Sequence, residues 1–180
     1  MRSEADAEKI RRLVRSLGRA ARGPGRVYLT GGTSAVLIGW RGSTIDADLR
    51  LDPEPAGAFE AIARIKDELD VNVELASPAD FVPVPPDWRE RSVFIESVGR
   101  VDFFHFDFRA QALAKIERGH ERDLSDVEQM IAHGLVDPGA LAEVFERIRE
   151  ELVRYPAIDE AAFRAKLDAF LDRTRRRGSP

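Results

Sequence analysis

Two aspartates, Asp46 and Asp48, lie two residues apart in the segment Ile45-Asp46-Ala47-Asp48-Leu49-Arg50-Leu51, which alternates strictly between apolar and polar residues. This alternation predicts a strand with one buried face. Residues two apart on a strand point to the same face, separated by about 6–7 Å at a rise of about 3.3 Å per residue. We therefore expect both carboxylates on one face, and Ile45, Ala47, Leu49 and Leu51 on the opposite, buried face.

A pair of carboxylates on one strand face has a specific chemical use. The two charges repel, so one group is expected to hold a proton unless a cation is supplied. Carboxylate oxygens are the ligands that Mg²⁺ takes, usually together with substrate phosphates, and such a pair can hold two metals about 3.5–4 Å apart for phosphoryl displacement. The alternative is a solvated polar face without ligands, because short acidic motifs are common.

A glycine turn precedes this strand. Gly31 and Gly32, followed by Thr33 and Ser34, lie at the predicted junction of a strand and a helix. Unpaired backbone N–H groups and the helix dipole favour phosphate at a helix N-terminus, and glycine lets the backbone approach a ligand closely. Thr33 or Ser34 either adds a hydroxyl donor to a phosphate or caps the helix.

The surrounding sequence predicts an α+β fold: a mixed sheet flanked by helices, with a helical C-terminal region. Residues 1–108 are expected to form the core with its N-terminal helix, and residues 109–180 the helical region packed on it. Ser3 is the expected N-cap of the first helix, and the basic tail 173–177 is expected to be a frayed, solvated end. The expected helices cover 4–21, 33–40, 59–69 and most of the chain beyond Phe108, the expected strands 26–30, 45–51, 71–75, 93–95 and 101–105, and a proline-rich loop 77–88.

Composition excludes several classes of protein. The 180 residues are 43% hydrophobic and 33% charged, which is enough apolar material for a core. The formal net charge of −4 argues against a protein that binds nucleic acid over its whole surface, although a local basic surface remains compatible with it. No cysteine is present, so thiolate metal sites and a cysteine nucleophile are excluded. Without a membrane-length apolar run or a signal peptide, we expect a cytoplasmic protein with no membrane partner.

The segments Leu29–Ser34 and Arg41–Leu49 together resemble the signature of the polymerase-β-type nucleotidyltransferase superfamily. In that superfamily a glycine turn precedes a strand with alternating apolar residues and two aspartates. The subset with the greatest similarity comprises small bacterial nucleotidyltransferases related to toxins of abortive-infection and toxin–antitoxin systems. Those proteins also carry a helical Lys…Arg-Asp-x-x-Asp segment, similar here to Lys115 followed by Arg122, Asp123 and Asp126.

The resemblance implies a nucleotidyltransferase fold and an Mg²⁺-dependent enzyme, with Mn²⁺ as the alternative metal. Such an enzyme moves a nucleoside monophosphate from an NTP such as ATP to a hydroxyl of RNA or tRNA, a protein or a small molecule. It also implies a third acid on a later strand. Strand order favours Glu74; Asp102 has the same local pattern on the later hairpin, and Asp107, at a helix start, is instead expected to cap that helix.

The remaining candidates have two interpretations each. Lys115 either offsets charge on the leaving pyrophosphate or is a surface lysine whose stem lies along the core. Arg41 either binds phosphate or forms a structural ion pair. Asp123 and Asp126 either contribute to activity, as the resemblance implies, or serve capping and ion pairing.

Three aromatic or basic side chains lie outside these motifs. Trp88 and Arg89 are expected to hold the proline-rich loop on the core rather than to stack on a base. His105 is expected to be a strand-face histidine and not a ligand.

Three functional hypotheses follow from the sequence. The first is a nucleotidyltransferase in which Asp46, Asp48 and Glu74 bind metal, Gly31, Gly32, Thr33, Ser34 and Arg41 bind the nucleotide, and Lys115 offsets phosphate charge. In this hypothesis the protein acts as a toxin with a cognate antitoxin. The second is a catalytically silent nucleotide-binding, antitoxin or regulatory module, and the third is a structural adaptor.

Overall fold

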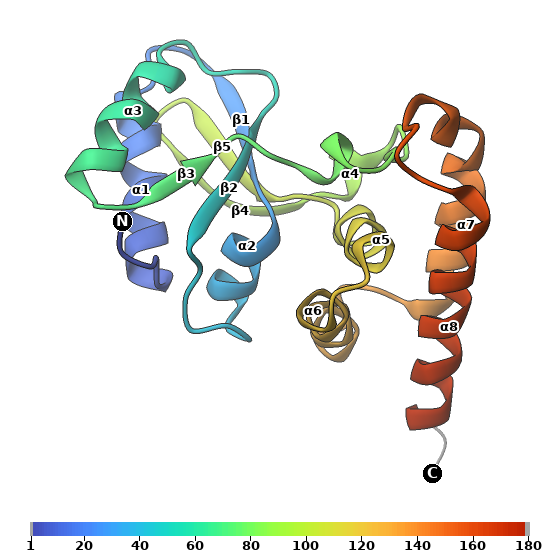
Figure 1. Ribbon diagram of the computed structural model, residues 1–180. Helices are drawn as coiled ribbons and strands as arrows, with labels where there is room; N and C mark the ends of the chain where they lie inside the picture. The colour runs from blue at the N-terminus through green and yellow to red at the C-terminus, as the bar shows by residue number, and fades with distance from the viewer. Residues whose placement is uncertain (1, 179–180) are drawn as a thin grey trace. The chain divides into compact units, whose positions relative to one another are not determined.

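The computed structural model describes residues 2–178, which form two compact units (Figure 1). The first unit comprises residues 2–77 and 92–106, and the second comprises 78–91 and 107–178. The proline-rich segment therefore belongs to the second unit, although the hairpin that follows it belongs to the first. The predicted α+β class is confirmed, because a mixed open sheet occurs together with mostly helical segments.

The first unit contains a five-stranded sheet in the order β3-β2-β1-β5-β4. Strands β1 and β5 are parallel, as are β2 and β3, whereas β2 runs antiparallel to β1 and β4 antiparallel to β5. The strands are β1 (Gly25–Leu29), β2 (Asp46–Leu51), β3 (Asn72–Glu74), β4 (Val93–Val98) and β5 (Val101–His105). The helices of this unit are α1 (Ala7–Ala20), α2 (Gly31–Ile38) and α3 (Ala58–Glu68).

Helix α1 forms because its apolar residues recur at helical spacing and its first turn is capped. Ile10, Leu13, Val14 and Leu17 are buried on one face. The Asp6 side chain accepts a hydrogen bond from the Lys9 amide at 2.8 Å. The prediction that Ser3 caps this helix was wrong: its hydroxyl instead donates to Asp70 at 2.7 Å, because the chain at Ser3 still runs beside the loop before β3.

The core of the first unit lies on one face of the sheet. Inward-facing residues of the strands pack against α1 and α3; they are Val27, Leu29, Ala47, Leu49, Val73, Val101 and Phe103. Because side chains alternate along a strand, the opposite face carries the intervening residues, which include both aspartates of β2. The alternation along β2 thus places the two candidate metal ligands, Asp46 and Asp48, on the face of the sheet that does not contact the core.

The second unit is built around α5 (Phe108–Arg118), nearly all of whose side chains from Phe108 to Ile116 are buried. Helices α6 (Glu121–Ala132), α7 (Pro138–Ile148) and α8 (Glu160–Gly178) complete it, with short segments α4 (Trp88–Arg91), η1 (Pro78–Asp80) and η2 (Arg149–Arg154). Breaks between the helices fall at residues 119–120, 133–137 and 155–159. Helices α7 and α8 meet through Phe145 and Phe163, whose rings lie 5.0 Å apart edge to face.

Two predictions about this unit were wrong. The tail 173–177 is helical rather than frayed, because Arg173 and Arg177 both pair with Glu128, at 2.9 and 2.8 Å. The proline-rich segment is not wholly irregular, since Pro78–Asp80 forms a 3₁₀ turn. Proline has a fixed φ that suits such turns.

Candidate functional site

Strand β2 places Asp46 and Asp48 on one half-buried face, as the alternation predicts. Ala47 and Leu49 point the other way and are buried. Ile45 departs from the pattern: its side chain is 59% exposed, because it lies in a bend before the strand begins. The expected burial of Ile45 was therefore wrong, and Leu51 is half-buried rather than fully enclosed.

Strand β3 adds polar side chains beside the two aspartates. In the parallel register Asp46 lies opposite Asn72, and Asp48 opposite Glu74. Directly opposed residues project to the same face of a sheet, so Glu74 lies beside Asp48. The Asn72 amide confirms this arrangement by donating to Asp46 Oδ1 at 2.5 Å. Glu74 itself is exposed.

Asp102 occupies a different part of the same face. It lies opposite Arg26, at the start of β1, whereas the Thr30 amide just past the end of β1 donates to the Asp48 carbonyl at 3.2 Å. The Ser97 hydroxyl donates to Asp102 Oδ1 at 2.5 Å. The register therefore brings Glu74, and not Asp102, next to the β2 aspartates. No three histidine, cysteine or acidic side chains of residues 2–178 are grouped closely enough to form a metal site by themselves.

The glycine turn touches the aspartates. Helix α2 begins at Gly31 itself, two residues earlier than predicted, and Gly31 has a φ of +56°, which favours glycine. A Cβ atom at this position would lie 2.7 Å from Asp48 Oδ2. A side chain here would therefore displace the carboxylate, so the absence of one allows the acid to lie against the N-terminus of α2. The positive end of the helix dipole favours that negative charge.

The second glycine of the turn is equally confined. A Cβ atom at Gly32 would lie 2.3 Å from Thr44 Oγ1 and 3.4 Å from Nη1 of Arg41. Arg41 thus borders the glycine turn with a half-buried side chain. This places a guanidinium at the turn where the sequence predicted phosphate binding.

The hydroxyls of Thr33 and Ser34, which follow the glycines, form buried hydrogen bonds within the protein. Thr33 Oγ1 accepts a hydrogen bond from the Asp48 amide at 2.9 Å, and Ser34 Oγ donates to the Leu29 carbonyl at 3.0 Å. Both residues are fully buried. Neither hydroxyl caps α2, so the capping alternative was wrong. The observed contacts instead tie the turn to β1 and β2.

The sequence did not predict the structural role of His105, which contacts the start of α2. Its Nδ1 lies 2.9 Å from Ser34 Oγ. Because Ser34 gives its hydrogen to the Leu29 carbonyl, Nδ1 of His105 must carry the hydrogen of this bond. Burial lowers the pKa of His105 to about 4, so the ring is neutral at pH 7. The chain Leu29–Ser34–His105 fixes the start of α2, and its only sequence signal is a histidine at a buried strand position.

The family comparison agrees with this geometry. A family model described as nucleotidyltransferase of unknown function (DUF6036) matches residues 9–174. The chain belongs to this nucleotidyltransferase family. The match covers both units, including the glycine turn, β2 and the buried helix α5. No curated protein and no solved structure is significantly similar to the chain.

Within the second unit of this family member, Lys115 is neither exposed nor alone. Its Nζ lies 2.6 Å from Asp126 Oδ2 and 3.1 Å from Asp123 Oδ1, and Asp123 also pairs with Arg118 at 2.7 Å. Lys115, Asp123 and Asp126 are 5%, 7% and 3% exposed. The surface-lysine alternative was therefore wrong. The ion-pairing interpretation of Asp123 and Asp126 is confirmed as a contact, whereas a part in activity stays a prediction.

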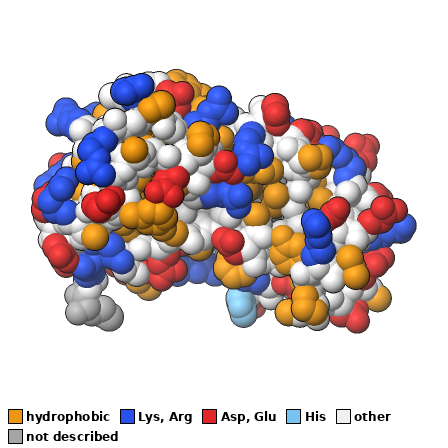
Figure 2. Space-filling model, turned by 90° about the horizontal axis from the view of Figure 1, so that it is seen from above, with side chains coloured by type: hydrophobic (Ala, Val, Ile, Leu, Met, Phe, Trp, Pro, Cys, Tyr) orange, Lys and Arg blue, Asp and Glu red, His pale blue; other side chains and the backbone are white. Residues whose placement is uncertain are grey.

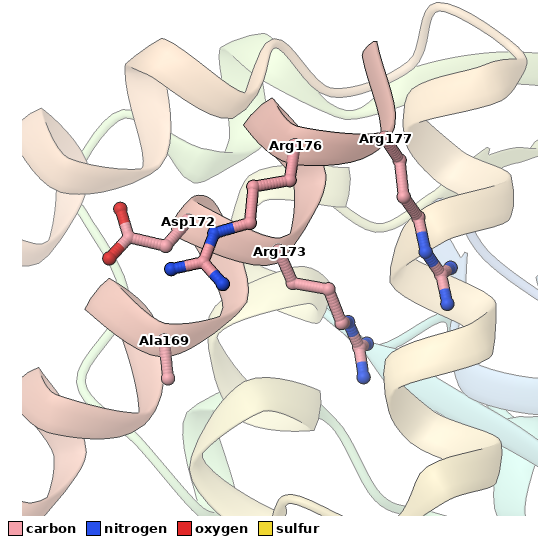
Figure 3. A pocket seen from close by; sticks show the side chains of 5 residues that line it. All are labelled: Ala169, Asp172, Arg173, Arg176 and Arg177. Atoms are coloured by element: carbon pink, nitrogen blue, oxygen red, sulfur yellow. The ribbon is translucent and has the colours of Figure 1, made fainter. Parts of the chain in front are cut away.

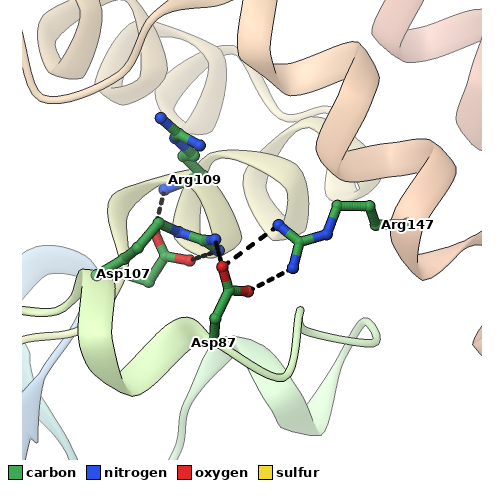
Figure 4. Close-up of polar contacts among 5 residues, drawn as sticks. Asp87, Asp107, Arg109 and Arg147 are labelled. Atoms are coloured by element: carbon green, nitrogen blue, oxygen red, sulfur yellow. Dashed lines mark hydrogen bonds and ion pairs between the residues drawn. The ribbon is translucent and has the colours of Figure 1, made fainter.

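A second charged network surrounds the N-terminus of α5 (Figure 4). Asp107 caps the helix by accepting from the Arg109 amide at 3.1 Å, as predicted, and pairs with Arg91 at 2.6 Å. Asp87 bridges Arg91 and Arg147 at 2.5 and 2.7 Å. Burial alone would lower the pKa of Arg91, but the carboxylates of Asp107 and Asp87 outweigh it and raise the pKa. This network orders the start of the central helix.

The aromatic side chain beside this network is structural. Trp88 is 4% exposed, and the Arg89 guanidinium lies 4.5 Å from its ring. The prediction that Trp88 packs rather than stacks on a base is confirmed by this burial.

The second unit has two hollows on its surface. One of about 510 Å³ is lined by Ala169, Asp172, Arg173, Arg176 and Arg177, all on α8 (Figure 3). Another of about 600 Å³ lies between the proline-rich segment and the end of α7, with Arg147 and Tyr155 in its lining. The helices of residues 2–178 include none long and apolar enough to cross a membrane.

Proposed function

We propose that this family member transfers a nucleoside monophosphate from an NTP to a hydroxyl acceptor in a reaction that depends on Mg²⁺. The observation that carries the proposal is the contact between Asp48 and the glycine turn, where a Cβ on Gly31 would meet Asp48 Oδ2 at 2.7 Å. A pair of strand carboxylates and a helix N-terminus thereby meet at one place. The first suits a hard cation, and the second suits phosphate.

The donor set of β2 fits Mg²⁺. Asp46 and Asp48 offer hard oxygen ligands on one face, and within residues 2–178 Asp46 has the Asn72 amide as its partner and no cation. Mg²⁺ commonly uses one or two carboxylates and completes its shell with water and substrate phosphates, and Mn²⁺ accepts the same ligands. When bound, the metal would polarise the α-phosphate and offset the charge that develops on it. Glu74 would complete the set beside Asp48.

The chain's own residues would then position a single displacement. The acceptor oxygen forms a bond to the α-phosphorus while the bond from that phosphorus to the pyrophosphate oxygen breaks, and pyrophosphate leaves with the electron pair. Glu74 takes the proton of the attacking hydroxyl. The backbone of Gly31 and Gly32 holds the β- and γ-phosphates at the N-terminus of α2, and Arg41 contributes positive charge there.

Isosteric amide variants test the proposal. The protein is incubated with Mg²⁺, α-labelled NTPs and either total RNA or protein lysate, and label on macromolecules is counted. Asp46→Asn and Asp48→Asn should each reduce transfer about 100- to 1000-fold, because ligands that stabilise developing charge have effects of this size. Asp67→Asn removes an exposed carboxylate of the same unit and should leave transfer unchanged. Metal-independent labelling, or full activity in the Asp46 and Asp48 variants, would overturn the proposal.

The same assay decides the third acid. Glu74→Gln should reduce transfer strongly, whereas Asp102→Asn should not, because Asp102 lies opposite Arg26 at the far end of β1. The reverse result would transfer the role to Asp102. Magnesium-independent NTP binding without product would favour the nucleotide-binding module without turnover.

We also propose that the activity is that of a toxin controlled by a cognate antitoxin. Its support is the resemblance of the glycine turn, the β2 aspartates and the Lys115–Asp126 segment to such toxins. Controlled expression in cells should arrest growth for the wild type but not for Asp46→Asn at equal protein level. Continued growth with active wild-type protein would contradict the toxin role while leaving nucleotidyl transfer intact.

A further inference from the structure

Helix α1 carries an uncompensated row of arginines. Arg11, Arg15 and Arg19 follow each other at four-residue spacing, and Arg12 lies beside them; all four are exposed. Within residues 2–178 none of the four forms an ion pair, a hydrogen bond or a ring contact. We name these four residues the α1 arginine row. At 1.5 Å per residue, it extends over about 12 Å.

This row is unusual for the molecule. The chain has a net charge of −4, and charged side chains of both signs are interspersed over the face in Figure 2. Many arginines elsewhere pair with acids: on α8, Arg164 pairs with Asp168 and Glu146, and Arg173 and Arg177 share Glu128. On the exposed face of α1, Glu8 is the one acid set against the four arginines. The positive charge there is local and unmatched.

We propose that the α1 arginine row binds the phosphate backbone of a polynucleotide, which is the acceptor of the transfer reaction. This inference rests on the proposed function and names its acceptor class. Arginine is the side chain suited to phosphate, because its planar guanidinium donates two parallel hydrogen bonds. Evenly spaced cations that lack protein partners complement a chain of evenly spaced phosphates. Binding of this kind is independent of base sequence.

The surroundings of α1 disfavour other anionic partners. All exposed residues of this helix are charged, and its apolar residues are buried in the core of the first unit. A protein interface needs a desolvated apolar or aromatic anchor, which this face lacks. A membrane-binding helix needs a free apolar face, and that of α1 is occupied.

The N-terminal end of α1 lies near the start of β2. Ala5, just before α1, exchanges two backbone hydrogen bonds with Thr44, at 2.8 and 3.0 Å, and Thr44 immediately precedes the bend into β2. Helix α1 also packs against α2, whose N-terminus holds the glycine turn. From Ala7, where α1 begins, to Arg11 the helix rises about 6 Å. The row lies on the core side of the sheet and Asp46 on the opposite side, so a bound single strand would pass the Ala5–Thr44 bridge to bring its terminal hydroxyl to Asp46.

Binding measured without nucleotide or Mg²⁺ tests the inference separately from catalysis. The full chain is titrated into labelled 20-nucleotide single strands, RNA in one arm and DNA in the other, at several KCl concentrations. The test variant carries Arg11→Gln, Arg12→Gln, Arg15→Gln and Arg19→Gln, since glutamine preserves helix propensity. The control carries Arg149→Gln, Arg154→Gln, Arg164→Gln and Arg175→Gln, the same charge change at arginines that pair with acids.

Four lost phosphate contacts should reduce the slope of log K against log[KCl] by about 3, because each contributes about 0.7 on a single strand. At 0.1 M KCl the test variant should bind on the order of 100-fold more weakly, and the control within about threefold of the wild type. Equal weakening of both variants, or no salt-dependent binding by the wild type, would overturn the inference. Tighter binding to vesicles of anionic lipid than to either polynucleotide would overturn it as well.

Failure of the inference and failure of the proposed function give different results. If the polynucleotide binds through the row but neither RNA nor DNA is ever labelled, the binding surface stands and the transfer reaction does not. If Asp46-dependent label appears on protein while no polynucleotide binds, transfer stands and the acceptor assignment is wrong. Asp46→Asn should bind the strands as tightly as the wild type, because it lies outside the row.

Discussion

Asp46 in the first unit and Asp126 in the second each lie near another aspartate, yet their partners differ. Asp126 and its neighbour Asp123 meet Lys115 at 2.6 and 3.1 Å, so their charge is compensated inside the protein. Asp46 accepts a hydrogen bond from the neutral Asn72 amide, and no cation of residues 2–178 pairs with it. The carboxylate of Asp126 is thus neutralised by a lysine of the chain, whereas that of Asp46 has only a neutral partner among residues 2–178.

The difference extends to the other ionisable groups of each unit. In the second unit, buried Asp107 pairs with Arg91. In the first unit, buried His105 has no charge to compensate, because burial keeps it neutral. Compensated charges are typical of structural networks, whereas uncompensated carboxylates at an accessible site are typical of ligand binding. We therefore assign Lys115, Asp123 and Asp126 to the architecture of the second unit, and this contrast supports the proposed role of Asp46 as a metal ligand.

The largest stability effect is expected from Lys115→Met. This change leaves Asp126 buried without its cation, and removing one member of a buried pair costs about 3–5 kcal/mol of the free energy of unfolding. Denaturant unfolding monitored by circular dichroism measures the loss. Lys166→Met, at a partly exposed lysine that pairs with Glu117, serves as the control and should cost less than about 1 kcal/mol.

The Lys115 experiment also separates the two interpretations of this residue. If Lys115→Met is as stable as the wild type but transfers no nucleotide, Lys115 acts on the triphosphate and the structural assignment is wrong. A double variant that adds Asp126→Asn should recover part of the lost stability, because it removes the unpaired charge. Failure to recover would point to the lysine's packing rather than to its charge.

A somewhat smaller effect concerns His105 and pH. The unfolded histidine binds a proton near pH 6.5, but burial lowers the pKa of the folded one to about 4. The unfolded state therefore binds more protons between these values, and the free energy of unfolding falls as pH falls from 6.5 to 4, by about 3 kcal/mol from this group. His105→Asn should remove this component. His120→Asn, at an exposed histidine, should retain it; equal pH profiles for wild type and His105→Asn would contradict the prediction.

Much of the first unit could be predicted from sequence because its signals are local. The alternation around Asp46 predicts a strand, the adjacent glycines Gly31 and Gly32 predict a turn, and strand order favours Glu74 as the third acid. The parts that the sequence did not reveal depend on long-range contacts. His105 meets Ser34, 71 residues away, and Arg173 is ordered by Glu128 on another helix. Periodicity and spacing contain no signal for such pairings, which is why the frayed-tail prediction failed.

A smaller effect on stability is expected from Mg²⁺ binding. It tests whether Asp46, which has no cation partner among residues 2–178, is a metal ligand. A ligand that binds the folded state at ten times its Kd stabilises it by about 1.4 kcal/mol. Mg²⁺ should therefore raise the melting temperature of the wild type, and Asp46→Asn should abolish the rise. In the absence of Mg²⁺, Asp46→Asn should be at least as stable as the wild type, because it removes repulsion from Asp48. A marked destabilisation would mean that Asp46 is structural, as Asp126 is.

The smallest effect on stability is expected at the exposed ion pair of Arg147 and Asp87, in the charged network around the N-terminus of α5. Arg147 donates to Asp87 at 2.7 Å and so holds the pKa of Asp87 below its ordinary value (Figure 4). Both side chains are 41–45% exposed, so Arg147→Gln should cost less than about 1 kcal/mol near pH 7. Because folding lowers the pKa of Asp87, the ion pair stabilises the folded state at pH values above the ordinary carboxyl pKa. This stabilisation is lost as the pH falls through the pKa that Asp87 has in the folded state. The buried ion pair of the same network, between Arg91 and Asp107, should contribute more to stability.

Arg91→Gln is that contrast, since Asp107, its partner at 2.6 Å, is 1% exposed. Removing the Arg91 guanidinium from this buried carboxylate should cost about 3–5 kcal/mol, several times the cost of Arg147→Gln. Denaturant unfolding of the two variants at pH 7 measures both values under one condition. Similar losses of stability in the two variants would show that solvent exposure does not determine how much each ion pair contributes to the free energy of unfolding. The distinction between compensated and uncompensated acids would then rest on activity rather than on stability.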